Sequence, residues 1–391
     1  MKVTPDIKDK IRTSILGLEK WVEAHGYKGY EPFDGLSSIF RPLTFGNLLL
    51  DRLLLQLVRQ SPWNLRPVLG VKPLDSTIGR GYMAWGYCTM FKLTGGRQYK
   101  EKIHRCLQWL IENKSVAYEE YSWGKHFDFA SRGGLYKAFE PILVWTALIA
   151  HAFLEAHETF GNRKYLDIAD SVCRWIMGLP RNQTDVGFCM GYHYQDFNAD
   201  IHNSNMVGAA VLARTAKHTG NGEYMAAAKG AMTYSCTRQL PNGAWWYGEE
   251  PTNHWIDNFH TGYNLDSLKC YIDATEDKTF EENLRRGFEF FRNHFFEESG
   301  RPRYYHNRTY PVDSQCASQA IETLANFSDY DESAPPLAVK VANWTIDNMQ
   351  DPEGYFYYRQ YPLGIKAKTP MLHWAQATTY KALAGLLSKM Q

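Results

Sequence analysis

The amino-acid sequence predicts an all-α protein whose helices form a closed (α/α)6 toroid, a ring of six inner and six outer helices. Three observations support this fold class. A unit of turn, aromatic run, polar loop and helix recurs along the 391 residues, most clearly in residues 239–274 and 348–387. The helical segments alternate between two compositions, and the loops before one set are long and rich in aromatic residues. Repeating units of this length bury their apolar faces against their neighbours.

The two clearest copies of the repeat correspond position by position. Gln239, Gly243 and the aromatic run 245–247 of the first copy match Gln350, Gly354 and the run 355–357 of the second. Weaker copies run through residues 186–213 and 300–325. The repeat therefore extends along most of the chain.

One set of helices is rich in small and mildly polar residues, as in 207–213 and 375–377. This composition is typical of helices that pack closely against protein on both faces, so we assign this set to the inside of the ring. The inner helices are predicted to begin near Ser76, Gly134, Asn203, Thr261, Ser314 and Pro370.

The other set carries charges on one face only, which is typical of helices with one side in water. These outer helices are predicted near Gln98, Asn162, Asn221, Thr279 and Ala334, and the segment from Pro5 to Ala24 supplies the sixth. Short links such as 218–224 and 273–280 lie at one end of the ring. We expect residues 1–391 to form a single toroid domain in which more than half of the residues are helical.

The composition excludes several classes of partner. Lys and Arg number 43 against 42 Asp and Glu, and no basic stripe stands out, so nucleic acid is not expected. The first residues lack the apolar centre of a signal peptide, and no apolar run approaches the roughly 20 residues that span a membrane. The seven cysteines are scattered without CxxC spacing, which indicates free thiols in a reducing cytoplasm. No metal-binding or cofactor-binding motif is present, so we expect neither group, and the sequence leaves the oligomeric state open.

The long loops at the other end of the predicted ring combine aromatic rings with Asp, His, Asn and Arg side chains. This mixture suits a sugar, because a flat ring stacks on the CH face of a pyranose while polar groups bond its hydroxyls. We therefore expect a carbohydrate substrate. The candidate substrate-binding residues are His126, Arg132, His202, Asn203, Trp246, Tyr305, His306, Arg308 and Trp374.

The candidate catalytic residues lie just before or at the start of predicted inner helices. Asp200, Asp257 and Asp313 each precede such a helix, where an Asp is more often a cap than a catalyst, but their recurrence at one mouth favours a functional role for at least one. His260 and Tyr263 are harder to explain as caps. We predict that one pocket is lined by Asp200, His202, Asp257, His260, Tyr263, Tyr305 and Trp374.

The residues also carry a resemblance to known families. Gln239, Gly243 and Trp245 resemble the repeat signature of terpenoid-cyclase toroids, but the acidic runs of those enzymes are missing. The six-hairpin layout resembles more closely the (α/α)6 glycosidase-like superfamily, which includes unsaturated-uronyl hydrolases, sugar 2-epimerases and glucuronyl C5-epimerase domains. The segments 27–36, 61–71, 201–205, 259–263 and 373–377 look like uncharacterised toroid proteins associated with bacterial and archaeal polysaccharide biosynthesis. This resemblance implies a glycan substrate, with a uronic-acid-containing glycan as one alternative, but it supplies no catalytic motif.

Three functions follow from this reading. The leading one is glycoside hydrolysis by two carboxylates, Asp257 and Asp200 with Asp313 in reserve, assisted by His260 and His202. The second is β-elimination or C5-epimerisation of a uronic acid, which uses Tyr263 or His260 as proton-transfer groups. The third is a glycan-binding scaffold without catalysis.

Overall fold

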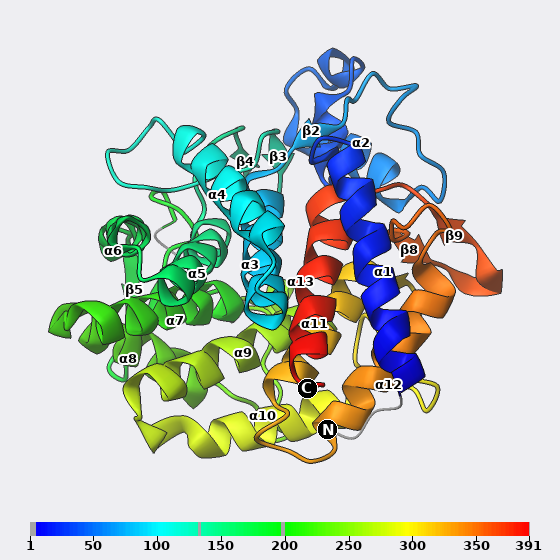
Figure 1. Ribbon diagram of the computed structural model, residues 1–391. Helices are drawn as coiled ribbons and strands as arrows, with labels where there is room; N and C mark the ends of the chain where they lie inside the picture. The colour runs from blue at the N-terminus through cyan, green and yellow to red at the C-terminus, as the bar shows by residue number, and fades with distance from the viewer. Residues whose placement is uncertain (1–4, 132–133, 197–199, 391) are drawn as a thin grey trace.

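The computed structural model describes residues 5–131, 134–196 and 200–390, and helices make up 60% of the structure. Figure 1 shows them as a ring of helical hairpins. Each inner helix contacts the next, and the last contacts the first, so the ring is closed. The inner helices are α3 (Thr77–Thr94), α5 (Leu143–Phe160), α7 (His202–Thr219), α9 (Asn258–Thr275), α11 (Ser314–Asn326) and α13 (Thr378–Ser388).

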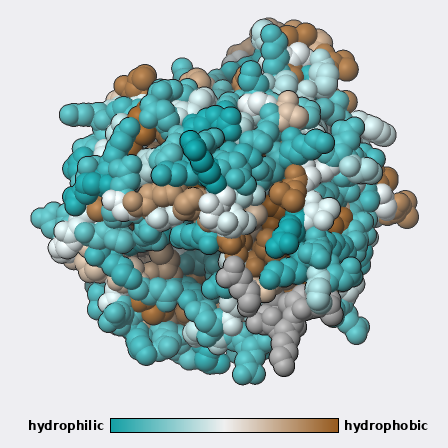
Figure 2. All heavy atoms as spheres, in the orientation of Figure 1, coloured by the Kyte–Doolittle hydropathy of each residue, from teal (hydrophilic) through white to brown (hydrophobic). Residues whose placement is uncertain are grey.

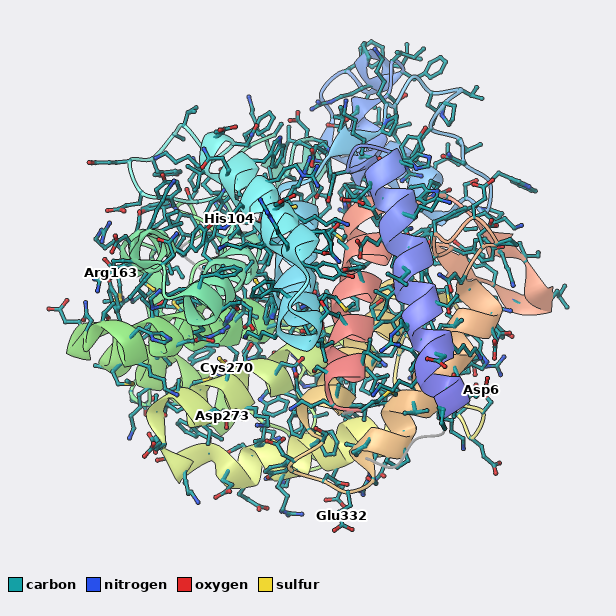
Figure 3. The ribbon with its side chains drawn as sticks, viewed as in Figure 1. Asp6, His104, Arg163, Cys270, Asp273 and Glu332 are labelled. Atoms are coloured by element: carbon teal, nitrogen blue, oxygen red, sulfur yellow. The ribbon has the colours of Figure 1, made fainter. Side chains whose placement is uncertain are left out.

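The outer helices each pack on an inner partner. They are α4 (Arg97–Glu112), α6 (Arg163–Met177), α8 (Gly222–Thr237), α10 (Glu281–His294), α12 (Ala334–Met349) and α1 (Pro5–Ala24), which packs on α13. Side chains such as Arg163 of α6 point outward from the ring (Figure 3). The prediction of an (α/α)6 toroid, with the first helix as the sixth outer member, is confirmed.

Small residues on the inner helices allow the close packing that the ring requires. A Cβ at Gly86 of α3 would lie 2.6 Å from the ring of Tyr380 on α13, and one at Gly262 of α9 would lie 2.7 Å from Gln319 on α11. These distances are shorter than any real van der Waals contact, so glycine at both positions sets how closely the neighbouring helices approach.

The links from inner to outer helices are short because the residue that ends one helix is followed directly by the residue that caps the next. α5 and α7 end at Gly161 and Gly220, both in the left-handed conformation with φ of 66° and 73°. The following Asn162 and Asn221 cap the outer helices, accepting hydrogen bonds from Lys164 N at 3.1 Å and from Glu223 N at 2.9 Å. This pairing of a left-handed glycine with an Asn cap is a recognised way to stop and restart a helix.

One predicted helix start was wrong. The second inner helix begins at Leu143, not near Gly134. The intervening chain forms a hairpin of β3 (Phe129–Ala130) and β4 (Leu135–Tyr136), and Gly134 has a φ of 145° that is incompatible with a helix. Pro141 then blocks helical hydrogen bonding just before α5.

The remaining short strands lie in the segments outside the helices. β1 (Lys28–Gly29) pairs with β2 (Leu74–Asp75), and β5 (Arg181–Gln183) pairs with β6 (Phe188–Met190). A third sheet has the order β7-β8-β9, from Val312–Asp313, Arg359–Gln360 and Lys366–Ala367. All of these pairs are antiparallel.

The segment between α1 and α3 projects beyond the ring, at the top of Figure 1. It contains the 3-10 turns Asp34–Ser37 and Arg41–Thr44 and the helix α2 (Leu48–Gln60). The buried Arg66 anchors it by binding Asp34 at 2.7 Å and the carbonyl of Glu31 at 2.7 Å. At the other end of α2, the side chain of Gln60 accepts from Arg359 Nη1 at 3.2 Å. α2 therefore runs from the β3 region to β8 and bridges two distant parts of the ring.

The projecting segment also carries many of the exposed large apolar side chains, which Figure 2 shows as brown atoms at the top of the molecule. Phe45 is 87% exposed and Leu57 is 63% exposed. None of the described helices combines the length and the apolar character that crossing a membrane requires.

Candidate functional site

A cavity of about 1010 Å³ opens at the end of the ring that holds the long loops and the projecting segment. Its volume is at the upper end of the range for small-ligand pockets and accommodates a mono- or disaccharide. Many of the side chains in its wall are aromatic. The aromatic residues that line it are Phe33, Phe127, Phe129, Tyr136, Trp145, Tyr192, Tyr247, Trp255, Phe259, Tyr263, Tyr304, Tyr305 and Trp374.

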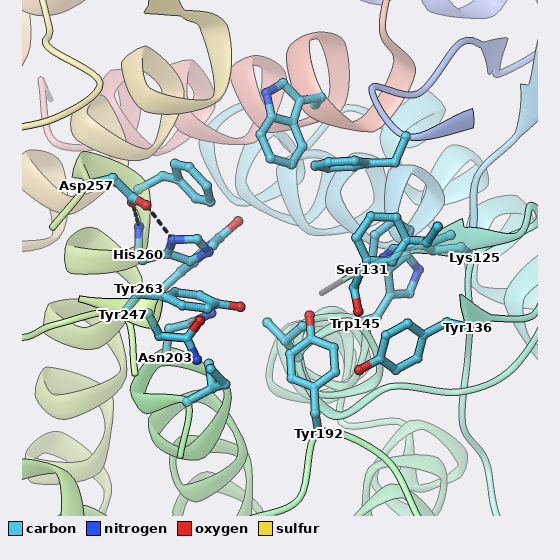
Figure 4. A pocket seen from close by; sticks show the side chains of 18 of the residues that line it. Lys125, Ser131, Tyr136, Trp145, Tyr192, Asn203, Tyr247, Asp257, His260 and Tyr263 are labelled. Atoms are coloured by element: carbon cyan, nitrogen blue, oxygen red, sulfur yellow. Dashed lines mark hydrogen bonds and ion pairs between the residues drawn. The ribbon is translucent and has the colours of Figure 1, made fainter. Parts of the chain in front are cut away.

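The first functional group in this wall is a carboxylate–histidine pair at the start of α9. Asp257 caps the helix by accepting from His260 N at 2.9 Å, and its other oxygen accepts from His260 Nδ1 at 2.7 Å and from Trp255 Nε1 at 3.1 Å. Figure 4 shows His260 directed into the cavity while Asp257 lies behind it. Because a carboxylate only accepts hydrogen bonds, Nδ1 carries a proton and Nε2 is the atom left to exchange one with a ligand.

A second pair of the same kind is built from opposite ends of the sequence. Glu31, from the segment after α1, binds His373 Nδ1 at 2.5 Å and the backbone N of His373 at 3.2 Å. Burial alone would raise the pKa of Glu31, but the positive charge and hydrogen bonds of His373 outweigh burial and lower the pKa below its usual value. His373 lies in a π-helical turn, Leu372–Ala377, that precedes α13, and such turns are frequent at functional sites.

Both histidines line the same cavity, and both have Nδ1 held by a carboxylate that is at most 2% exposed. No described residue is hydrogen-bonded to Nε2 of either ring. Two imidazoles oriented in this way can remove a proton from a bound ligand and return one to it.

Lys125 adds an amine to the opposite wall of the cavity, across from Asp257 and His260 in Figure 4. Its Nζ lies 3.9 Å from the centre of the Phe129 ring and 5.5 Å from that of Trp145. Burial lowers the pKa of Lys125 to about 7, against the opposing effect of the nearby Glu31 charge. The amine therefore gains or loses its charge easily near neutral pH.

Two further polar side chains from inner helices face the ligand space. Asn203 of α7 lines the cavity, and its buried Oδ1 has no hydrogen-bond partner among the described residues. Tyr263 of α9 is bonded through its hydroxyl to Gln315 Nε2 at 2.7 Å and to Tyr82 Oη at 3.1 Å. Burial raises the pKa of Tyr263 well above its usual value, so the hydroxyl stays neutral and acts as a hydrogen-bonding group.

Seven of the candidate residues from the sequence line this cavity. They are Asp200, Asn203, Asp257, His260, Tyr263, Tyr305 and Trp374. These residues lie where a ligand would bind, and the catalytic and binding roles that we assign to them stay predictions. Asp200 braces a loop, since its Oδ2 accepts from Glu250 N at 2.7 Å and from Asn253 Nδ2 at 3.3 Å.

Two candidates are buried away from the cavity, contrary to our prediction for His202. His202 is fully buried and binds Glu249 Oε1 through Nε2 at 2.7 Å. Asp313 caps α11, accepts from Trp374 Nε1 at 2.7 Å and pairs with the buried Arg359 at 2.5 Å. Both side chains are fully used in holding loops in place.

The other described candidates also lie outside the cavity lining. Trp246 stacks on His254 with ring centres 4.9 Å apart, and Arg308 lies 4.2 Å over the ring of Tyr305. His306 Nδ1 contacts the carbonyl of Ile256 at 3.3 Å, and burial lowers the pKa of His126 to about 4. Arg132 lies outside the described residues.

The candidate set from the sequence omitted several polar residues that the structure places at the cavity, among them Glu31, His373, Lys125 and Arg59. Glu31 and His373 are separated by 342 positions, so their pairing is not visible in the chain. Lys125 and Arg59 both line the cavity, and neither belongs to a recognisable sequence motif. In the described part of the chain, no group of three His, Cys, Asp or Glu side chains is placed to hold a metal ion.

Comparisons with known proteins support the fold. Neither a scan of protein-family models nor a search of curated protein sequences finds a match. Among solved structures, cellobiose 2-epimerase from Bacillus thermoamylovorans is similar, with a TM-score of 0.64, 10% identity, and coverage of 80% of this chain and 87% of that one. Cellobiose 2-epimerase from Spirochaeta thermophila has a TM-score of 0.63 at 12% identity, covering 81% and 86%. A possible member of the GH105 family from Salmonella enterica has a TM-score of 0.59 at 14% identity, covering 79% and 82%.

Proposed function

We propose that this protein is a carbohydrate-active enzyme that moves a proton at a carbon next to a sugar carbonyl, as an aldose–ketose isomerase or a 2-epimerase. The observation that carries the proposal is the pair of histidines that line the same cavity, each with Nδ1 fixed by a buried carboxylate: Asp257 with His260, and Glu31 with His373. Two of the similar solved structures are cellobiose 2-epimerases, which supports the proposal.

The reaction needs a base and an acid at the carbon that changes. In the open-chain sugar, Nε2 of one histidine removes the proton on the carbon beside the carbonyl, and the C–H electron pair forms the double bond of an enediolate. A proton returned to the opposite face of the same carbon gives the epimer, and one returned to the former carbonyl carbon gives the isomer. No oxidant or reductant is consumed in either case.

The surrounding groups favour this chemistry. Each buried carboxylate stabilises the imidazolium that forms when its histidine takes up the proton. Lys125 and Asn203 lie on the cavity wall and can stabilise the negative oxygen of the enediolate. Because burial lowers the pKa of Lys125 to about 7, its charge responds readily to an anion formed beside it.

Glycoside hydrolysis is a second candidate, and the carboxylates of Asp200 and Glu250 on the cavity wall favour it. Asp257 suits this role less well than we expected from the sequence. It accepts three hydrogen bonds from Trp255 and His260 and is 2% exposed, so it is better placed to orient the histidine than to meet a glycosidic bond.

We place the reaction in the cytoplasm as part of polysaccharide biosynthesis, in keeping with seven unpaired cysteines and the resemblance noted above.

The test is proton exchange with solvent. Wild-type protein is incubated with a panel of aldoses and ketoses in D₂O, and NMR follows deuterium at C2 and the appearance of the epimer or ketose. We expect His260→Asn and His373→Asn each to reduce exchange by about 10²–10⁴-fold, the usual contribution of a general acid or base.

His254→Asn is the matched control, because His254 stacks on Trp246 and does not line the cavity. It should exchange at the wild-type rate. A wild type that cleaves glycosides in an Asp200-dependent manner, with no deuterium incorporation, would replace this proposal with hydrolysis.

A further inference from the structure

We infer that the cavity is built for a sugar that carries an anionic group, a carboxylate or a phosphate, and that Arg52 and Arg59 of α2 bind this group. The inference rests on the proposed function for the reactive end of the sugar and names the substrate class. It begins from the position of α2, which bridges the ring from the β3 region to β8 and turns one face toward the cavity. Arg52, Gln56 and Arg59 line the cavity from this face.

The spacing of these three residues explains why they share a face. Positions i, i+4 and i+7 lie on one side of an α-helix, and seven residues span about 10 Å along its axis. The exposed Leu53 and Leu57 each follow a residue of this face by one position, so they lie about 100° around the helix from it. The two arginines are therefore directed at the ligand space by the helix itself.

Neither arginine has a carboxylate within ion-pair distance among the described residues, unlike several other arginines of this region. Arg41 pairs with Asp128 at 2.6 Å, Arg66 with Asp34 at 2.7 Å and Arg359 with Asp313 at 2.5 Å. Arg41 and Arg66, the other two arginines of the projecting segment, both have a carboxylate partner, so half-buried guanidinium groups without one on α2 indicate that the missing partner is a ligand.

Arg59 is also held in position before any ligand binds. Its guanidinium carbon lies 4.5 Å from the centre of the Phe33 ring, and its buried Nε has no hydrogen-bond partner among the described atoms. Lys125 approaches the same ring, with Nζ 5.9 Å from its centre. The arginine and the lysine thus form a basic region around Phe33.

Of the acidic residues that line the cavity, Glu31 and Asp257 are bonded to His373 and His260, and the other three come from the loops before α7 and α9. Asp196 and Asp200 lie before α7, and Glu250 lies before α9. Asp196 accepts from Tyr192 N at 2.8 Å, and Asp200 from Glu250 N at 2.7 Å. These carboxylates suit sugar hydroxyls, so the cavity has an acidic part for the neutral portion of the sugar and a basic part, beneath α2, for its charged end.

The experiment measures binding, which needs no turnover. Isothermal titration calorimetry compares D-glucuronate and D-glucose 6-phosphate with D-glucose, on wild type and on Arg52→Gln, Arg59→Gln and the double variant. We expect wild type to prefer an anionic sugar, and each substitution to weaken its binding on the order of 10- to 100-fold while glucose binding changes little. The two anionic sugars distinguish a carboxylate site from a phosphate site.

Lys72→Gln is the matched control, since Lys72 is exposed on the same segment and does not line the cavity. This substitution removes one positive charge that does not face the cavity, so the variant should bind anionic sugars as tightly as wild type does. Arg59→Lys keeps the charge but loses the planar guanidinium, so its affinity for the anionic sugar should lie between those of wild type and Arg59→Gln. This variant also keeps the inference testable if the double variant fails to fold.

The outcomes separate this inference from the proposed function. Equal affinity of wild type for neutral and anionic sugars, or an anion preference that survives in the double variant, overturns the role of the arginines even when C2 exchange occurs. An anion preference that depends on Arg52 and Arg59, in a protein with no C2 exchange on any sugar of the panel, supports the inference and overturns the isomerase assignment.

Discussion

Two buried aspartates cap inner helices, and their amide variants should give opposite results. Asp257 caps α9 and holds Nδ1 of His260, whereas Asp313 caps α11 and holds Arg359. Asn is as good a cap as Asp, so neither amide variant loses the cap itself. The difference therefore comes from the second partner of each carboxylate.

In Asp257→Asn the amide presents an N–H group or a weaker acceptor to Nδ1 of His260. The favoured tautomer is inverted when Nδ1 becomes the acceptor, and Nε2 then carries the proton and no longer acts as a base. We expect exchange at C2 to fall by about 10²–10⁴-fold. Stability should fall by only about 1.5–3 kcal/mol, the contribution of a charge-assisted hydrogen bond.

In Asp313→Asn the guanidinium of Arg359, which is 2% exposed, loses its counter-ion. Removing one member of a buried ion pair costs about 3–5 kcal/mol, so this variant should be the less stable of the two. Exchange per folded molecule should stay within about tenfold of wild type, because Asp313 does not line the cavity.

Urea denaturation and deuterium incorporation at C2, both measured under conditions where each variant is folded, separate the two effects. The reasoning is refuted if Asp257→Asn keeps wild-type exchange. It is equally refuted if Asp313→Asn loses as much exchange as Asp257→Asn.

Two further predictions concern stability. Burial lowers the pKa of Lys125 from 10.5 to about 7, so between these values the unfolded chain binds more protons than the folded one and stability rises with pH. Lys125→Met should therefore raise the free energy of unfolding most below pH 7, and this increase should shrink toward pH 10.5. If denaturation curves show the same increase across this pH range, the lowered pKa of Lys125 is contradicted. Gly86→Ala should destabilise by about 1–3 kcal/mol because its Cβ would lie 2.6 Å from Tyr380. Gly385→Ala, on the facing helix with nothing within 4 Å, should instead stabilise by up to about 1 kcal/mol, and thermal unfolding of the pair checks both.

Sequence reasoning also located part of the site. Asp257 and His260 are three residues apart at a helix start, and one helical turn brings them together. The same reasoning was wrong for His202. It is the first residue of α7, whereas His260 is the third residue of α9, and two residues at about 100° each place the side chains on nearly opposite faces. An error of two residues in a predicted helix start is therefore enough to assign a side chain to the cavity when it lies in the buried core.

The ring could be predicted from the sequence because its signals are local and repeated. Small residues mark the inner helices, one-sided charge marks the outer ones, and residues such as Gly161 and Asn162 end one helix and start the next. Which side chains meet at the mouth depends instead on contacts between distant parts of the chain. Closing the ring joins Glu31 to His373 and lays Arg59 of α2 across the opening, and contacts between residues hundreds of positions apart leave no periodic signal in the chain.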